Sequence, residues 1–324
     1  MLRSRRLRQT ENLRRLRKET HLHIDDFIYP LFIVPGEGIK KEIPSLKDQY
    51  HLSVDMLEAE INEITSLGLK YVMLFGLPES KDELGTSGFI ENGTIQRAVR
   101  KIKEVNPDIV VVTDVCMCEY TSHGHCGILD DCGCVDNDCT LTYLSKIALS
   151  HAQTGADIIC PSDMMDGRVE AIRKTLDENG FVNTPILSHS SKFASSYYGP
   201  FREACDSAPS HGNRKGYQLD FHNGREAIME GEFDMMEGAD ILMVKPALAY
   251  LDVVKAYREN FNLPIAVYNV SGEYQMLVSA VDSGIVCEDI IYESLIAMKR
   301  AGADIIVSYF AKYAAKKIQS GEWI

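Results

Sequence analysis

The sequence predicts an α/β fold: a single (β/α)8 TIM barrel over residues 27–324, with an extended N-terminal arm over residues 1–26. Eight apolar runs alternate with amphipathic helical stretches from residue 27 onward. The runs are rich in Val, Ile and Leu without polar alternation, which is typical of parallel strands buried on both faces. A length of 324 residues is normal for one such barrel. An open doubly wound sheet is the alternative, but no glycine-rich dinucleotide-binding sequence follows the first strand.

The elements are expected in strict alternation along the chain. Strands are expected at residues 27–34, 71–77, 109–115, 157–160, 185–189, 241–244, 265–270 and 305–309. Helices are expected at residues 54–67, 93–105, 141–154, 168–178, 225–237, 251–259, 274–300 (two helices) and 311–318. Gly-Ala-Asp recurs at 155–157, 238–240 and 302–304, where the glycine closes a helix as its C′ residue. The stretch 193–223 has no predicted element, and a loop of that length in a barrel is typical of a lid.

Composition limits the possible partners of the chain. The net charge of −13 disfavours nucleic acid or an anionic membrane as a partner of the body. No run of eighteen apolar residues is present, so we expect no membrane span. Six of the nine cysteines lie between residues 116 and 139, and no apolar signal segment precedes them. This clustering predicts metal or thiol chemistry in a reducing cytoplasm rather than a disulfide framework.

The first eighteen residues are basic, in contrast to the acidic body. The cations are Arg3, Arg5, Arg6, Arg8, Arg14, Arg15, Arg17 and Lys18. A mitochondrial transit peptide is disfavoured by Glu11 and Glu19, and a nucleic-acid-binding arm would be expected to interleave aromatic residues with the charges. Charge complementarity favours an arm that lies on an acidic neighbouring subunit, and therefore a homo-oligomer.

Three cysteines follow the third predicted strand with the spacing of a metal site. Cys116 and Cys118 are two residues apart and Asp114 precedes them by two, so on a continuing strand all three would point to one face. Cys126 would return to them through a loop that contains Gly124. Three thiolates favour Zn²⁺ and leave one position open, which describes a catalytic ion. The alternative is a closed structural zinc site that recruits a fourth ligand from Cys132, Cys134, Cys139, His123 or His125.

Two lysines stand at the ends of neighbouring predicted strands. Lys192 follows the fifth strand, and Lys245 ends an apolar run in the sixth. Burial among apolar neighbours disfavours the ammonium form, so we expect a lowered pKa and a nucleophilic amine at Lys245. Two ammonium ions on adjacent strands also repel, so one or both amines lose their proton more readily. A pair of imine-forming lysines beside a metal suits an enzyme that joins two carbonyl compounds. All of these residues fall at the carboxyl ends of strands, where barrel active sites are built.

These motifs resemble the porphobilinogen synthase family, also called 5-aminolevulinate dehydratase. The resemblance is carried by residues 114–127, 161–167, 190–202, 243–246 and 270–273, and it extends from the basic arm to the last strand. It implies a lyase that condenses two 5-aminolevulinate molecules to porphobilinogen in tetrapyrrole and heme biosynthesis, with loss of two waters. It also implies a barrel with an N-terminal arm that embraces a neighbour, usually in a homo-octamer.

The resemblance assigns roles to particular residues. Lys245 would form a Schiff base with the first substrate and Lys192 would hold the second, which Zn²⁺ on Cys116, Cys118 and Cys126 would polarise. Asp114 and Ser162 would contact the amino group of the first substrate, and Ser271 and Tyr309 would bind its carboxylate. The carboxylate of the second substrate would be bound by Arg202, Arg214 and Gln218. Tyr198 would pack near the lysines. Glu230 is the nearest match to a glutamate that binds an activating Mg²⁺ in some members. The role of Cys132, Cys134 and Cys139 stays open.

Two other functions remain in view. A class I aldolase or decarboxylase needs one Schiff-base lysine on a barrel, which would leave the cysteines and the second lysine without a role. A zinc-stabilised scaffold could use the basic arm to bind RNA, and it would unfold on chelation.

Overall fold

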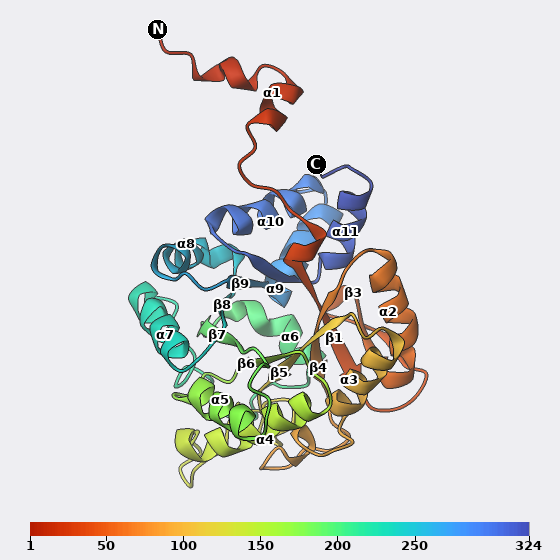
Figure 1. Ribbon diagram of the computed structural model, residues 1–324, viewed down its shortest axis with the longest axis vertical. Helices are drawn as coiled ribbons and strands as arrows, with labels where there is room; N and C mark the ends of the chain where they lie inside the picture. Colours follow the sequence, from red (N-terminus) through yellow and green to blue (C-terminus); the bar gives the residue numbers. More distant parts are fainter. Residues whose placement is uncertain (324) are drawn as a thin grey trace.

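The predicted strands form one parallel barrel with the helices on its outside (Figure 1). The computed structural model describes residues 1–323. The strands follow chain order around the barrel: β1 (Phe27–Val34), β4 (Tyr71–Gly76), β5 (Val110–Val115), β6 (Ile158–Pro161), β7 (Leu187–Lys192), β8 (Ile241–Lys245), β9 (Ile265–Asn269) and β10 (Ile305–Ser308). Because β10 pairs with β1, the sheet returns on itself. The predicted fold class is confirmed, and every strand lies within three residues of its expected bounds.

The outer helices also match their expected positions. They are α2 (Leu57–Ser66), α3 (Thr94–Val105), α4 (Asn137–Gln153), α5 (Arg168–Glu178), α7 (Gly224–Met236), α8 (Leu251–Asn260), α9 (Ser271–Asp282), α10 (Asp289–Ala301) and α11 (Ala311–Gln319). The segment 274–300 does contain parts of two helices, α9 and α10. The strands between them are almost fully buried, which explains their continuous apolar sequence.

The Gly-Ala-Asp repeat has a structural role beyond ending a helix. The three glycines have positive φ angles, of 98° at Gly155, 105° at Gly238 and 127° at Gly302, as expected where a helix ends. The aspartates then accept hydrogen bonds from the backbone N–H groups of Val111 to Asp157 (2.6 Å), of Ile186 to Asp240 (2.8 Å) and of Ile265 to Asp304 (2.8 Å). Each repeat therefore anchors the start of the preceding strand.

The barrel has a seam between β6 and β7. The other neighbouring strands share runs of parallel partners, whereas the described parts of β6 and β7 meet through the isolated bridge Ile159↔Ile186. The backbone N–H of Ile159 donates to the carbonyl of Pro185 at 3.1 Å. The register of β7 against β8 also shifts between Ser188 and Ser191. A regular backbone ladder therefore does not connect the carboxyl ends of β6 and β7.

Two parts of the fold differ from the prediction. An antiparallel hairpin, β2 (Lys40–Ile43) and β3 (Leu46–Ser53), was not predicted, because its first strand is polar and mostly exposed. The stretch 193–223 is not wholly without structure, since it contains α6 (Gly199–Ala204). Pro200 lies in the first turn of this helix, where its missing N–H has no partner to lose.

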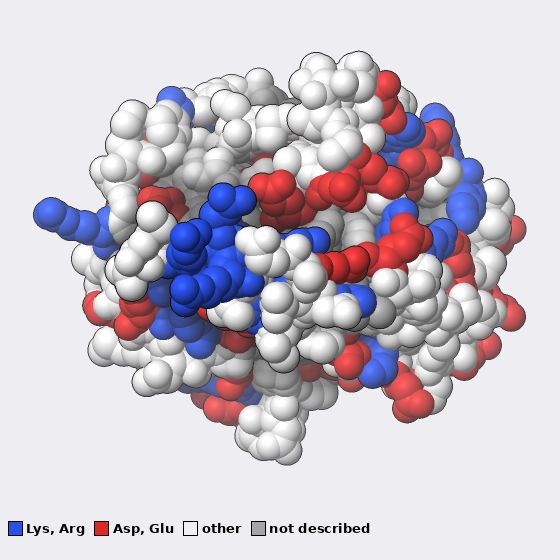
Figure 2. Space-filling view, turned by 90° about the horizontal axis from the view of Figure 1, so that it is seen from above, with Lys and Arg blue, Asp and Glu red and all other residues white. Residues whose placement is uncertain are grey.

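The N-terminal arm projects from the body in Figure 1. It contains the short helices η1 (Ser4–Arg8) and α1 (Glu11–Leu16), in which no residue is buried. Figure 2, viewed from the side of the arm, shows a dense cluster of Lys and Arg side chains close to groups of Asp and Glu side chains. Among the described residues, no helix has both the length and the apolar character needed to cross a membrane.

Candidate active site

The two predicted lysines meet at the carboxyl end of the barrel. Lys192 is the last residue of β7 and Lys245 the last of β8, and the two are direct partners in the parallel register. Only 6 % of Lys192 and 4 % of Lys245 is exposed. Parallel strands lie about 4.8 Å apart, so the two side chains leave their strands as immediate neighbours. The predicted juxtaposition is present.

Lys245 lies among aromatic rings. Its Nζ is 4.1 Å from the ring centre of Tyr268, 5.1 Å from that of Phe201 and 5.9 Å from that of Tyr198. The Tyr198 hydroxyl also donates to the carbonyl of Lys245 at 3.1 Å. Burial, followed by the charge of Lys192, lowers the pKa of Lys245 to about 8. About a tenth of this amine is therefore neutral at pH 7, far more than for an ordinary lysine, and the neutral form is the nucleophile.

Lys192 has a more polar environment. Its Nζ donates a hydrogen bond to the carbonyl oxygen of Ser162, at the end of β6. Burial lowers the pKa of Lys192, but negative charge on Cys126, Cys116 and Cys118 more than reverses this effect and raises it. Of the two amines, Lys245 is therefore the one that loses its proton more readily, and the two lysines are not equivalent.

The three cysteines form a buried cluster beside Lys192. The Sγ atoms of Cys116, Cys118 and Cys126 all lie within 4.8 Å of one another, and all three residues are buried. The side chains do not meet on a continuing strand, because β5 ends at Val115, as its predicted bounds have it. A turn in which the N–H of Tyr120 donates to the carbonyl of Met117 (2.9 Å) follows, and Cys118 Sγ comes to 3.4 Å from Cys116 Sγ. The three thiols suit a tetrahedral ion with a fourth position left for another ligand.

Asp114, near the end of β5, and Ser162, directly after β6, lie at the same end of the barrel as the lysines. Burial and then the charge of Glu119 raise the pKa of Asp114 to about 7, against the lowering effect of Lys192, Lys245 and a hydrogen bond from the Ser162 side chain. This carboxyl group is therefore able to accept or release a proton near neutrality.

A small cavity joins several of these groups. It is lined by Cys118, Glu119, Ser162, Lys192, Tyr198, Phe201, Arg202, Arg214 and Lys245. Its free space is about 10 Å³, roughly the room of one water molecule. A substrate of several heavy atoms therefore enters only if the segment 193–223, which carries Tyr198 and both arginines, moves outward. This agrees with the expected lid.

Arg202, Arg214 and Gln218 have buried polar atoms that make no hydrogen bond with the described residues. Within residues 1–323, the Nε atoms of Arg202 and Arg214 and both amide atoms of Gln218 are buried without a partner. Arg214 also donates to the carbonyl of Gly124 at 3.0 Å, which ties the segment 193–223 to the cysteine loop. Buried polar atoms without partners are uncommon, and here they are available to an anionic ligand. Gln218 itself lines a neighbouring, larger cavity rather than the small one.

Ser271 and Tyr309 lie farther around the barrel end. The Ser271 hydroxyl accepts from the N–H of Phe201 (3.0 Å) and donates to the carbonyl of Tyr197 (3.3 Å), so it currently holds the lid segment. The Tyr309 hydroxyl lies 3.1 Å from that of Tyr268, whose ring lies below Lys245. Ser271 therefore contacts a wall of the small cavity through Phe201, whereas Tyr309 lines a larger, separate cavity together with Tyr29 and Tyr274. Neither Ser271 nor Tyr309 lines the small cavity.

The other candidate residues lie outside the lysine cavity. Glu230, on α7, is about half buried, and burial raises its pKa to about 7. Cys132, Cys134 and Cys139 are exposed free thiols. Both ring nitrogens of His125 have partners, the Tyr217 hydroxyl at 3.1 Å and the carbonyl of His211 at 3.0 Å, so His125 supports the loop.

Some residues of this site could not be recognised in the sequence. Tyr268 has the position of an ordinary apolar residue in β9, and Glu119 that of a loop carboxylate. In the structure, Cys118 Sγ donates to Glu119 Oε2 at 3.2 Å. The only signal in the sequence for the contact of Glu119 with the cysteine cluster is its position next to Cys118 in the motif 114–126.

Comparison with known proteins places this site in a family. Residues 1–317 match the family model described as delta-aminolevulinic acid dehydratase. A delta-aminolevulinic acid dehydratase of Archaeoglobus fulgidus is 51% identical over 98% of this chain and 98% of its own length. That of Bacillus subtilis is 50% identical over 97% of both chains.

A solved structure agrees with these sequence matches. It is the delta-aminolevulinic acid dehydratase (porphobilinogen synthase) of Toxoplasma gondii ME49 in complex with the reaction product porphobilinogen. It superposes with a TM-score of 0.95 at 44% identity and covers 98% of this chain and 91% of that chain. The lysine pair, the cysteine cluster and these matches lead to one conclusion: the chain belongs to the delta-aminolevulinic acid dehydratase family.

Proposed function

We propose that this enzyme condenses two molecules of 5-aminolevulinate into porphobilinogen, with loss of two waters, as a lyase of tetrapyrrole biosynthesis. The observation that carries the proposal is the direct pairing of Lys192 with Lys245 beside three buried thiols. Two amines are needed to hold two ketones at once. A class I aldolase would use one such lysine, so the second amine and the thiol cluster favour the condensation.

Lys245 forms the first imine. Its neutral amine attacks the ketone of the first substrate, and water leaves as the C=N bond forms. The pKa of about 8 makes the free amine available, and the rings of Tyr268, Phe201 and Tyr198 exclude water around it. Asp114 and Ser162 hold the amino group of this substrate, and Ser271 and Tyr309 bind its carboxylate once the lid segment has moved.

Lys192 holds the second substrate, also as an imine. The unpartnered Nε atoms of Arg202 and Arg214 and the amide of Gln218 support binding of its carboxylate, because a guanidinium group binds a carboxylate with two parallel hydrogen bonds. Holding both substrates in fixed orientations removes much of the entropic cost of joining them. The titration of Asp114 near pH 7 supports a role in proton transfer at the first amino group.

We propose Zn²⁺ as the ion held by Cys116, Cys118 and Cys126. Soft thiolate ligands select zinc over magnesium, and the spacing of the three Sγ atoms supports a tetrahedral site. When bound, the ion would supply Lewis-acid polarisation at the second substrate. Mg²⁺ at Glu230 is proposed as a separate, activating ion. Magnesium keeps several waters and needs few protein ligands, and Glu230 shares a cavity with Asp166 and Glu226.

The arm supports a proposal about assembly. Its cations are exposed, and the body of the chain is acidic, so we propose that the arm lies on a neighbouring subunit of a homo-octamer. All nine cysteines are free thiols, which supports a reducing compartment, the cytoplasm.

One assay with two readouts tests the function. Pyrrole formation from 5-aminolevulinate is measured after chelation and after return of Zn²⁺ or Mg²⁺, and circular dichroism is recorded on the same samples. We expect activity to vanish on chelation and to return with Zn²⁺, while the barrel stays folded. No borohydride-trapped adduct at Lys245 in the active enzyme would reject the mechanism, and unfolding on chelation would favour a structural metal.

A further inference from the structure

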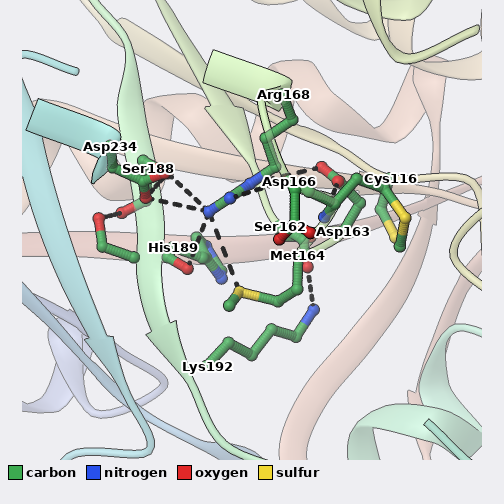
Figure 3. A network of polar contacts seen from close by, with 12 residues as sticks. Cys116, Ser162, Asp163, Met164, Asp166, Arg168, Ser188, His189, Lys192 and Asp234 are labelled. Carbon is green, nitrogen blue, oxygen red and sulfur yellow. Dashed lines mark hydrogen bonds and ion pairs between the residues drawn. The ribbon is translucent and has the colours of Figure 1, made fainter. Parts of the chain in front are cut away.

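The buried guanidinium of Arg168 links both sides of the seam between β6 and β7 (Figure 3). Arg168 is the first residue of α5, and only 2 % of it is exposed. Burying a charge is costly unless it is fully paired, so a fully buried arginine calls for an explanation. No step of the proposed chemistry uses this residue.

Arg168 binds β7 and α7 through one nitrogen. Its Nη2 donates to Ser188 Oγ at 3.0 Å and to the carbonyl of His189 at 3.3 Å, both in β7. The same nitrogen lies 3.0 Å from Asp234 Oδ2 in α7, and Ser188 Oγ donates to that oxygen at 2.6 Å. Ser188 and His189 lie four and three residues before Lys192 along β7.

The other side of the guanidinium holds the loop after β6. Arg168 Nη1 donates to the carbonyl of Met165 at 3.2 Å, and Nε lies 3.9 Å from Asp163 Oδ2. Asp163 Oδ1 in turn accepts from the N–H of Met165 at 2.8 Å. Between them, Met164 has a φ of +74°, a left-handed conformation that is uncommon for a residue with a side chain. Arg168 and Asp163 therefore stabilise a strained loop.

This loop carries the hydrogen-bond acceptor of Lys192. The amine donates to the carbonyl of Ser162, which immediately precedes Asp163. The regular ladder is missing between β6 and β7, so the backbone alone does not fix the distance between the Ser162 carbonyl and the end of β7. The pairing of Arg168 with Asp234, Ser188 and Met165 spans that gap.

We propose that Arg168 is a positioning residue that sets the place of the Lys192 amine by bridging the β6/β7 seam, with Asp234 as its anchor. Lys245 stands on β8, which pairs with β9 in register and with β7 across the register shift between Ser188 and Ser191. The hydrogen bonds of the guanidinium go instead to β7, α7 and the loop after β6. Loss of the contacts of Arg168 should therefore impair binding of the second substrate at Lys192 and leave formation of the first imine at Lys245 unchanged. This inference rests on the proposed roles of the two lysines.

The test uses the full-length, metal-loaded enzyme and measures overall turnover separately from imine formation at Lys245. Arg168→Lys keeps the positive charge but cannot reach Ser188, Asp234 and Met165 together, because lysine lacks the planar fork. We expect turnover to fall about tenfold or more, equivalent to about 1.4 kcal/mol per factor of ten, while borohydride trapping at Lys245 keeps its wild-type rate and stoichiometry. Arg173→Lys is the matched control. Arg173 also lies on α5 and bonds the loop before β7, through the carbonyls of Thr184 (2.6 Å) and Phe181 (2.8 Å).

The outcomes are distinct. Turnover of Arg168→Lys equal to that of Arg173→Lys, or a parallel loss of trapping at Lys245, overturns the positioning role. Absence of any adduct at Lys245 in the wild type refutes the proposed function itself. If Arg168→Lys does not fold, Ser188→Ala replaces it, since it removes one hydroxyl between Arg168 and Asp234. It should lower turnover about two- to fivefold at unchanged Lys245 trapping, and unchanged turnover in this variant overturns the proposal.

Discussion

The pKa of Lys245 offers the sharpest test of the lysine pair. At pH 7 an amine with a pKa of about 8 is neutral for about 9 % of the time, against about 0.03 % at the ordinary 10.5. The lowered pKa therefore increases the reactive form by about 300-fold. Burial is the largest cause and the neighbouring charge of Lys192 the second. Lys192→Met removes the second cause and keeps the first.

The sign of the expected change follows from the charge removed. Without the Lys192 cation, protonation of Lys245 becomes easier, so its pKa rises above about 8 but stays below the ordinary value because Lys245 is still buried. Imine formation then needs a higher pH, and each unit of rise lowers the rate at pH 7 by about tenfold. The assay is the initial rate of borohydride trapping of 5-aminolevulinate at Lys245 between about pH 6 and 10.

A control separates this effect from general damage. Lys299→Met removes a partly buried lysine that pairs with Asp26 at 2.9 Å, where β1 begins, away from the carboxyl ends of the strands. Its trapping curve should coincide with the wild type. An unchanged midpoint in Lys192→Met, or a wild-type midpoint near 10.5, would refute the electrostatic reasoning.

Three further outcomes are expected. Gly272→Ala should weaken substrate binding and raise KM in steady-state kinetics, because its Cβ would lie 2.5 Å from the Tyr197 carbonyl and displace the lid segment; an unchanged KM would count against that contact. Asp240→Ala should lower the free energy of unfolding, measured with urea, by about 1–3 kcal/mol, because the Ile186 N–H loses its hydrogen-bond partner. Glu104→Ala, which removes an exposed ion pair, should change this free energy little. Deletion of residues 1–18 should give smaller oligomers by analytical ultracentrifugation with reduced activity, and an octamer of wild-type size would contradict the role of the arm.

The lysine pair shows what local sequence can predict about a site. Lys192 and Lys245 each end an apolar run, and the rule that active sites lie at the carboxyl ends of barrel strands then places them together. The cysteine cluster was predicted, but the way in which its thiols converge was not. The spacing of Cys116 and Cys118 would place both side chains on one face only if the strand continued, whereas β5 ends at Val115 and a turn brings the thiols together. Residue types determined the chemistry there, and backbone hydrogen bonds determined the geometry.

The sequence by itself determined the barrel, because burial on both faces requires continuous apolar strands and because helix ends require glycine in the Gly-Ala-Asp repeats. The tertiary structure alone decided that β6 and β7 lack a regular ladder and that Arg168, an unremarkable first residue of a helix, bridges them. For the lysines, the apolar run before Lys245 predicted its lowered pKa, and the tertiary structure added the cysteine charges that raise the pKa of Lys192. The missing ladder, the Arg168 bridge and this effect of the cysteines could not be read from the sequence. They depend on distances between residues far apart in the chain, and hydrogen bonds and electrostatic effects on pKa depend on those distances.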